Sequence, residues 1–206
     1  MATRVLIVFH SLHGHVYRLA ESVAEGAREV ADVDVRLTQV AETLPQEILE
    51  RMGAVETKQT FAHVPVAKTE ELAEADAVIL GTPTRYGAAT AQMQAFLDAT
   101  GRHWVQGALV GKIGSAFTST ASQHGGQETT LVHVHTFFFH QGMVVVGVPY
   151  EAQELLDLEA ISGGTPYGAS TIAGPRGERS PTANELAIAR FQGRHVARLA
   201  TRLTPR

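Results

Sequence analysis

The chain has 206 residues, with 17 basic and 21 acidic side chains, ten histidines and no cysteine. This length fits one α/β domain, and hydrophobic residues at 44% exclude a disordered chain. The absence of cysteine excludes disulfides, thiolate nucleophiles, iron–sulfur clusters and cysteine-ligated zinc. The formal charge of −4 gives no general attraction to nucleic acid, and the apolar runs are too short to span a membrane. With no pattern of a secretion signal at its start, the chain is expected to be cytoplasmic, with neither nucleic acid nor a membrane as partner.

The first part of the chain reads as strand, helix and strand. Residues 4–9 are apolar and β-branched, which is typical of a strand buried on both faces of a parallel sheet. Apolar residues then recur at helical spacing over 16–30 and predict a helix that faces the sheet. An alternating pattern over 33–37 predicts an edge strand, and residues 44–69 indicate an irregular connection with one short helix.

The middle of the chain repeats this order. Residues 77–80 predict a second buried strand, and the glycine and proline of residues 81–87 predict a loop after it. Apolar residues at helical spacing predict a helix over 91–100 that ends at Gly101. Residues 112–117 predict a less hydrophobic strand.

The last part of the chain adds a helix, a strand, a long loop and a final helix. Residues 127–140 favour a helix, and residues 143–148 favour the last buried strand. Residues 150–181 are rich in glycine and proline and predict a long loop with little regular structure. Residues 182–203 carry an apolar side at helical spacing and predict the terminal helix.

Strands and helices therefore alternate throughout the chain. This alternation predicts one domain, residues 1–206, with a doubly wound parallel sheet of five strands, helices on both faces and an insertion at about 150–181. Ligands of such sheets bind at the carboxyl ends of the strands. Three predicted loops lie at such ends, at residues 10–15, 82–88 and 118–126.

The first of these loops has the features of a phosphate site. It joins a buried strand to the start of a helix, where unpaired backbone N–H groups and the helix dipole favour an anion. Ser11 adds a hydroxyl donor, and Gly14 permits a tight turn. The alternative is an ordinary connection in which Ser11 caps the helix. The loop is neither a P-loop nor a Gly-x-Gly-x-x-Gly fingerprint, which argues against ATP and a Rossmann-bound dinucleotide.

The other two loops offer groups that suit a planar anionic ligand. Arg85 and Tyr86 supply a cation and an aromatic ring, with a rigid turn and a solvent-facing arginine as the alternative. Residues 119–126 supply hydroxyls and a flexible backbone, with a mobile surface loop as the alternative. Taken together at one sheet edge, the three loops resemble the FMN site of a flavodoxin.

Longer segments carry a more specific likeness. They are residues 81–87 (GTPTRYG), 92–101 (QMQAFLDATG), 125–128 (GGQE), 140–142, 163–174 (GGTPYGASTIAG) and 185–193 (ELAIARFQG). These segments closely resemble the WrbA family of flavodoxin-like, FMN-dependent NAD(P)H:quinone oxidoreductases. The resemblance covers essentially the whole chain.

The resemblance implies a flavodoxin-like homotetramer with FMN as cofactor and NADH or NADPH as electron donor. It implies two-electron (hydride) reduction of quinones to hydroquinones, in which both substrates use one pocket in turn by a ping-pong mechanism. One alternative is a flavodoxin-type electron carrier, against which the mild charge and the insertion argue. The other is a non-enzymatic stress or regulatory interaction protein.

The resemblance also implies a set of site residues. Arg85 would stabilise the reduced flavin and His140 would donate a proton or hydrogen bond to the quinone, so both would be catalytic. His13 and Trp104 would contact the substrates, Trp104 from a neighbouring subunit. The residues implied to hold FMN are Ser11, Leu12, His13, Gly14, His15, Val16, Pro83, Thr84, Arg85, Tyr86, Gly87, Ser119, Thr120, Ala121, Ser122, Gln123, His124, Gly125 and His140.

Two positions depart from the family pattern. His13 stands where the family usually has a tyrosine associated with the nicotinamide, and an imidazole stacks less extensively and titrates near neutral pH. The loop at residues 119–126 is one residue longer and less rich in glycine than is usual. The first departure bears on donor binding and its pH dependence. The second bears on the width of the pocket over the flavin or on the preferred quinone.

Metal and DNA sites are not favoured by the pattern. His133, His135 and His140 do not share one helical face at i, i+4 spacing, so no metal is expected. A row of arginines on the last helix favours a solvated face with cations near the helix C-terminus over a contact with DNA. These arginines are Arg190, Arg194, Arg198, Arg202 and Arg206.

Overall fold

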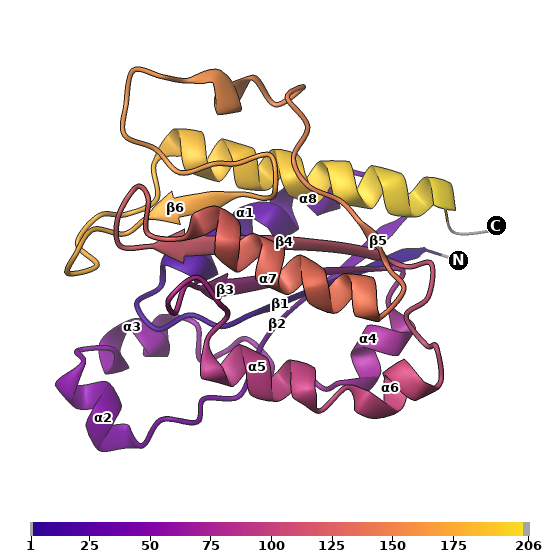
Figure 1. Ribbon diagram of the computed structural model, residues 1–206, viewed down its shortest axis with the longest axis horizontal. Coiled ribbons are helices and arrows are strands. Elements are labelled where there is room, and N and C mark those ends of the chain that lie inside the picture. Colours follow the sequence, from indigo (N-terminus) through magenta and orange to yellow (C-terminus); the bar gives the residue numbers. More distant parts are fainter. Residues whose placement is uncertain (1, 204–206) are drawn as a thin grey trace.

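A parallel β-sheet between two layers of helices organises residues 2–203, the part of the chain that this computed structural model describes (Figure 1). The strands are β1 (Thr3–Phe9), β2 (Val33–Gln39), β3 (Ala77–Pro83), β4 (Ile113–Thr120), β5 (Val144–Val145) and β6 (Ser170–Ile172). They lie in the order β2-β1-β3-β4-β5, all parallel, and β6 also pairs with β4. The predicted doubly wound sheet of five strands is confirmed, with a sixth strand added.

Helices cover both faces of this sheet. They are α1 (His15–Arg28), α2 (Gln46–Arg51), α3 (Val55–Thr60), α4 (Glu70–Glu74), α5 (Ala91–Asp98), α6 (Gly101–Val105), α7 (Gln127–His140) and α8 (Ala183–Leu203), with a 3-10 turn at Gln153–Leu156. Because side chains alternate along a strand, Val5 and Ile7 pack with α1 and α8, whereas Leu6 and Val8 pack with α5 and α7. Within residues 2–203, no helix is long and apolar enough to cross a membrane. Arg206, the last of the row of arginines, lies outside the described residues.

The fifth position of the sheet is shared by two short strands. β5 pairs with the start of β4 at Ile113 and Gly114, and β6 pairs with its end at residues 118–120. Residues 146–169 leave the sheet between them (Figure 1). The sequence predicted one strand over 143–148 and a long loop with little regular structure over 150–181. Three residues are too few to show a strand pattern, and β6 is defined by its pairing with β4.

Short helices and strand ends account for the other differences. Two helices, α2 and α3, form within residues 44–69, where one was predicted. Gly101 begins α6 and does not simply end a helix, because α5 already stops at Asp98 and the carbonyl of Thr100 accepts the first hydrogen bonds of a new turn. β4 continues to Thr120, beyond its predicted end, because its last residues pair with strands on both sides.

Helices α1 and α8 approach so closely that two glycines are required at their contact. A Cβ on Gly26 would lie 1.8 Å from the carbonyl oxygen of Arg190, and one on Gly193 would lie 1.9 Å from that of Val23. Both distances are far below van der Waals contact. The backbones therefore touch directly, and the terminal helix is locked onto the first one.

A partly buried ion pair fixes the segment after β2 to the edge of the sheet. The carboxylate of Glu42 accepts a hydrogen bond from Gln92 Nε2 at 2.8 Å and lies 2.9 Å from Lys58 Nζ and 3.4 Å from His10 Nε2. Burial alone raises the pKa of Glu42, but these partners outweigh that effect, and its pKa lies well below the usual value of 4.5. Ionised Glu42 therefore stabilises the fold.

Replacing Gly193 with alanine tests the helix contact. We expect Gly193→Ala to lower the free energy of unfolding by about 1–3 kcal/mol, because a methyl group must push α1 and α8 apart. The measurement is urea unfolding followed by circular dichroism. Gly101→Ala is the matched control, since a Cβ there meets nothing within 4 Å. An equal loss in both variants would contradict the close contact.

A pH series tests the role of Glu42. Since its pKa is depressed in the folded state, the stabilisation by Glu42 is complete above pH 4.5 and is lost as the pH falls through the folded pKa. We expect Glu42→Gln to be less stable by about 1–3 kcal/mol at pH 6, and this difference to shrink in acid. Unfolding by urea at several pH values measures it, with the exposed Glu47→Gln as control. A difference independent of pH down to the acid limit would refute the assignment.

Candidate functional site

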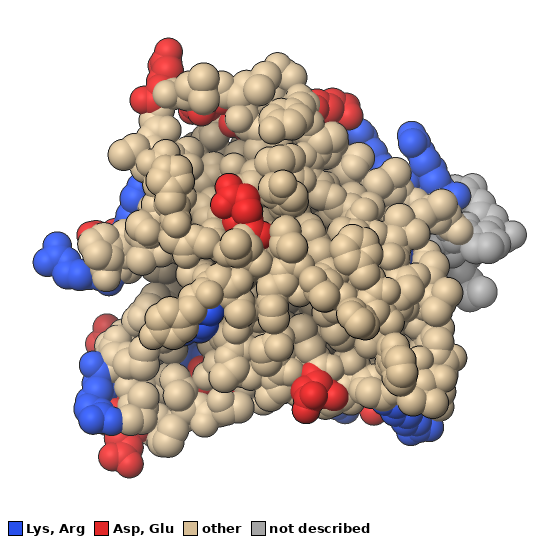
Figure 2. All heavy atoms as spheres, in the orientation of Figure 1, with Lys and Arg blue, Asp and Glu red and all other residues tan. Residues whose placement is uncertain are grey.

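A cavity of about 340 Å³ lies at the carboxyl edge of the sheet, where the three predicted loops meet. The first loop contributes Ser11, Leu12, His13, His15 and Val16; the second Pro83, Thr84 and Arg85; the third Ser119, Thr120 and Ala121. Met52 and residues 173–177 complete the lining. A notch at the left of the outline in Figure 2 separates the two protruding parts of this edge. The structure thus brings the three loops together around one space.

The first loop presents unpaired donors to this cavity. Gly14 precedes α1 with a φ of 81°, and a Cβ on it would lie 2.9 Å from Thr57 Cγ2, so the tight turn requires glycine. No side chain caps the start of α1, so the predicted alternative of a Ser11 cap is wrong. The Ser11 hydroxyl is buried and has no hydrogen-bond partner among the described residues. A buried hydroxyl beside free helix N–H groups fits a phosphate.

The second loop is a tight turn that holds Arg85 at the cavity. The backbone N–H of Arg85 donates to Ala88 at 2.8 Å, and that of Ala88 donates back at 3.0 Å. The side chain of Arg85 donates to the carbonyl of Thr84 at 2.8 Å. Tyr86, at the tip with a φ of 54°, has a fully exposed side chain, and neither it nor Gly87 lines the cavity.

The third loop reaches the cavity only with its first residues. Ser119 and Thr120 still belong to β4 and, with Ala121, form one wall. The Thr120 hydroxyl donates to the carbonyl of Ser122 at 2.7 Å, which turns the chain away from the cavity. The remaining predicted residues do not line it; they are Ser122, Gln123, His124 and Gly125.

A fourth segment, residues 173–177, closes the cavity and was not predicted as part of the site. The backbone N–H of Ala173 donates to the carbonyl of Thr120 at 2.7 Å, which continues the pairing of β6 with β4. At the other end, His15 Nε2 lies 3.0 Å from the carbonyl oxygen of Gly177. The sequence indicates this segment only through the Gly-Pro-Arg-Gly stretch at residues 174–177, which lies inside the predicted long loop.

His140 and Trp104 lie away from the cavity in this chain. His140 is the last residue of α7, and Gln127 is the first. A helix of 14 residues places them about 20 Å apart, and the side-chain amide of Gln127 donates a hydrogen bond to Thr120 at the cavity wall. Trp104, on α6, is 58% exposed, and α6 starts beside the end of α7 because Gln141 donates to the hydroxyl of Thr100 at 3.2 Å. Neither side chain lines the cavity of its own chain.

The histidines of the first loop are neutral near pH 7. Burial, together with the charge of Arg85, lowers the pKa of His13 below 6.5. Burial also lowers the pKa of His15, although its hydrogen bond to Gly177 opposes the shift. At neutral pH, Arg85 is therefore the positively charged side chain that the three predicted loops contribute to the cavity lining. The anion-binding groups beside it are hydroxyl and backbone N–H donors.

Comparisons with known proteins agree with this geometry. Residues 3–153 match the family model described as NADPH-dependent FMN reductase. A relative from Geotalea uraniireducens, named "NAD(P)H dehydrogenase (quinone)", is 58% identical over 97% of this chain and 98% of its own length. A relative of the same name from Syntrophobacter fumaroxidans is 59% identical over 98% of both chains.

Solved structures show the same fold at lower identity. A WrbA-like flavodoxin from Agrobacterium tumefaciens has a TM-score of 0.68 at 24% identity and covers 98% of this chain and 100% of its own. A flavodoxin from the domain Archaea has a TM-score of 0.62 at 19% identity, with 97% and 99% covered. The predicted WrbA resemblance is confirmed by these matches and by those of the curated relatives. The chain belongs to the family of NADPH-dependent FMN reductases, in a flavodoxin-like fold.

Proposed function

We propose that this chain is an FMN-dependent NAD(P)H:quinone oxidoreductase that reduces quinones to hydroquinones by two electrons. The observation that carries the proposal is the buried, unpartnered hydroxyl of Ser11 beside the free start of α1, at a cavity formed by three loops of the sheet edge. Relatives of 58% and 59% identity over nearly the full length carry the name of this activity. We further expect the protein to work in the cytoplasm.

The cavity residues divide into two groups by their chemistry. Ser11 and the backbone of residues 12–16 would hold the FMN phosphate through hydroxyl and N–H donors. Residues 83–85 and 119–121 would hold the two edges of the ring system. Bound there, FMN supplies the two-electron chemistry between a nicotinamide and a quinone.

The side chains of this chain supply charge and orientation. Arg85 carries a positive charge at the cavity and would stabilise negative charge that develops there during reduction. Its guanidinium is held by the carbonyl of Thr84, and the hydroxyl of Thr84 is in turn bonded by Thr130 at 2.8 Å. With one cavity for both substrates, the donor would leave before the quinone enters, which is a ping-pong sequence. His13, at the exposed side of the first loop, would contact the donor.

A homotetramer would complete the site. His140 and Trp104 do not reach the cavity of their own chain, so they would contact the quinone in a neighbouring subunit, with His140 as hydrogen-bond or proton donor. The face turned to the viewer in Figure 2, over α7, carries few charged side chains. Exposed apolar side chains on α7, Val132 and Phe139, support burial against another copy.

The flavin spectrum tests the activity directly. Protein saturated with FMN and freed of excess flavin should keep a flavin absorbance band, lose it on anaerobic addition of NADH or NADPH, and regain it with benzoquinone. Steady-state rates with both substrates varied should give parallel double-reciprocal lines. Failure to retain flavin would refute the proposal, and intersecting lines would refute the ping-pong sequence alone.

Replacing Ser11 tests the phosphate position. We expect Ser11→Ala to weaken FMN binding about tenfold, since one hydrogen bond to a charged group is lost. Riboflavin, which has no phosphate, should bind both proteins equally. Without flavin, the variant should be as stable as the wild type or slightly more stable, because the buried hydroxyl has no partner there. Quenching of flavin fluorescence measures both affinities, and an equal loss for riboflavin would contradict the assignment.

A further inference from the structure

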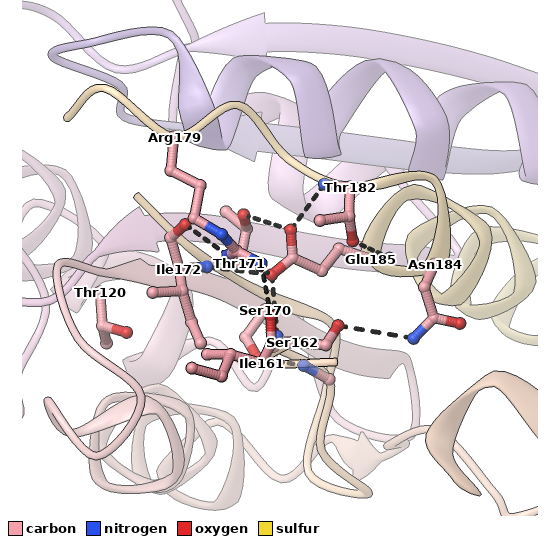
Figure 3. A network of polar contacts seen from close by, with 12 residues as sticks. Thr120, Ile161, Ser162, Ser170, Thr171, Ile172, Arg179, Thr182, Asn184 and Glu185 are labelled. Atoms are coloured by element: carbon pink, nitrogen blue, oxygen red, sulfur yellow. Dashed lines mark hydrogen bonds and ion pairs between the residues drawn. The ribbon is translucent and has the colours of Figure 1, made fainter. Parts of the chain in front are cut away.

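A buried carboxylate stands behind the fourth wall of the cavity. Glu185, in the first turn of α8, has an exposed fraction of 0%, and none of its atoms lines the cavity. Figure 3 shows it at the centre of a network that joins α8, β6 and the segment between them. A buried charge is tolerated only where hydrogen bonds satisfy it. Its partners therefore show what it holds in place.

Five hydrogen bonds converge on this carboxylate from three stretches of the chain. They come from Gly163 N at 2.8 Å, Thr171 Oγ1 at 2.8 Å, Ile172 N at 3.1 Å, Arg179 Nη1 at 3.2 Å and Thr182 N at 2.7 Å. Three of these partners precede the wall segment 173–177, with Thr171 and Ile172 directly before it, and two follow it. Glu185 thus holds both ends of the wall.

Arg179 extends the same network. Its Nη1 also donates to the carbonyl of Ile172 at 2.8 Å, and its Nη2 donates to that of Ile161. Its backbone N–H donates to the carbonyl of Ala173 at 2.8 Å. The guanidinium therefore closes the wall segment into a loop whose two ends are bonded to each other.

The wall itself has few bonds of its own to the rest of the cavity. Ala173 bonds Thr120, and Gly177 bonds His15. Within the wall, Gly174 and Gly177 have φ values of 81° and 73°, in the region that glycine adopts freely. Such a segment would sample many conformations without anchors at its ends, and ordering it during binding would cost affinity.

We propose that Glu185 is a positioning residue for flavin binding: it keeps residues 173–177 in the conformation that closes the cavity and presents the Gly177 carbonyl to His15. This inference rests on the proposed FMN site. It assigns to a buried residue outside the cavity a role in the affinity for the cofactor.

The test compares Glu185→Gln with Gln192→Leu. Gln192 lies on the same helix with the same exposed fraction. Its side-chain amide forms hydrogen bonds with Ala169, Ser115 and Ala116, and none with the wall segment. Both variants remove buried hydrogen bonds and are expected to be less stable. Only Glu185→Gln disturbs the ends of residues 173–177, because its amide group faces the N–H of Thr182 and no longer neutralises Arg179.

Two measurements are made on each protein. Amide hydrogen exchange without flavin should show about tenfold faster exchange at Ala173, Gly177 and Arg179 in Glu185→Gln, and no change there in Gln192→Leu. Quenching of FMN fluorescence should show an FMN dissociation constant raised about tenfold in Glu185→Gln and unchanged in Gln192→Leu. Arg179→Lys serves as second variant if Glu185→Gln does not fold, with the same direction expected in both measurements.

The outcomes separate this inference from the proposed function. Equal FMN affinity in the wild type and Glu185→Gln overturns the positioning role, as does an equal loss in Gln192→Leu. If the wild type itself binds no FMN, the proposed function fails, and hydrogen exchange at residues 173–179 still decides whether Glu185 holds the wall.

Discussion

The whole site depends on the pairing of β4 along its full length. All eight residues of this strand are buried, and its end pairs with β3 on one side and with β6 on the other. The hydroxyl of Thr118 adds a bond to the carbonyl of Thr82 at 2.7 Å, which fixes the register where the strands meet the cavity. Because parallel strands end at the same edge, this pairing aligns the second loop, the third loop and the fourth wall.

The elements that depend on local pattern could be predicted from the sequence. Residues 4–9, 77–80 and 127–140 coincide with, or lie within, β1, β3 and α7, because a long apolar run or helical spacing reflects burial directly. The same holds for the place of the site, since the loops after β1 and β3 must meet at one edge. The likeness of whole segments to a known family added the cofactor and the reaction, which periodicity alone does not contain.

The parts that depend on tertiary contacts could not be predicted in this way. β6 has three residues, and its strand character comes from β4 and from the anchors at Glu185. The wall at residues 173–177 follows from β6, so it was missed as part of the site. Only part of the third loop reaches the cavity because Thr120 bonds Ser122 and turns the chain, a contact that composition does not reveal.

The two sides of the cavity control the charge around a bound anion in different ways. On the side of the first loop, burial keeps His10 and His15 uncharged near neutral pH, since it lowers the pKa of both below 6.5. An anion there would be held by fixed dipoles and hydroxyls, whose strength does not change as the pH crosses the usual range of histidine. On the opposite side, the negative charge of Glu185 is compensated by hydrogen bonds from backbone N–H groups and from Arg179 inside the protein. No carboxylate lines the cavity among the described residues, so nothing there repels a phosphate.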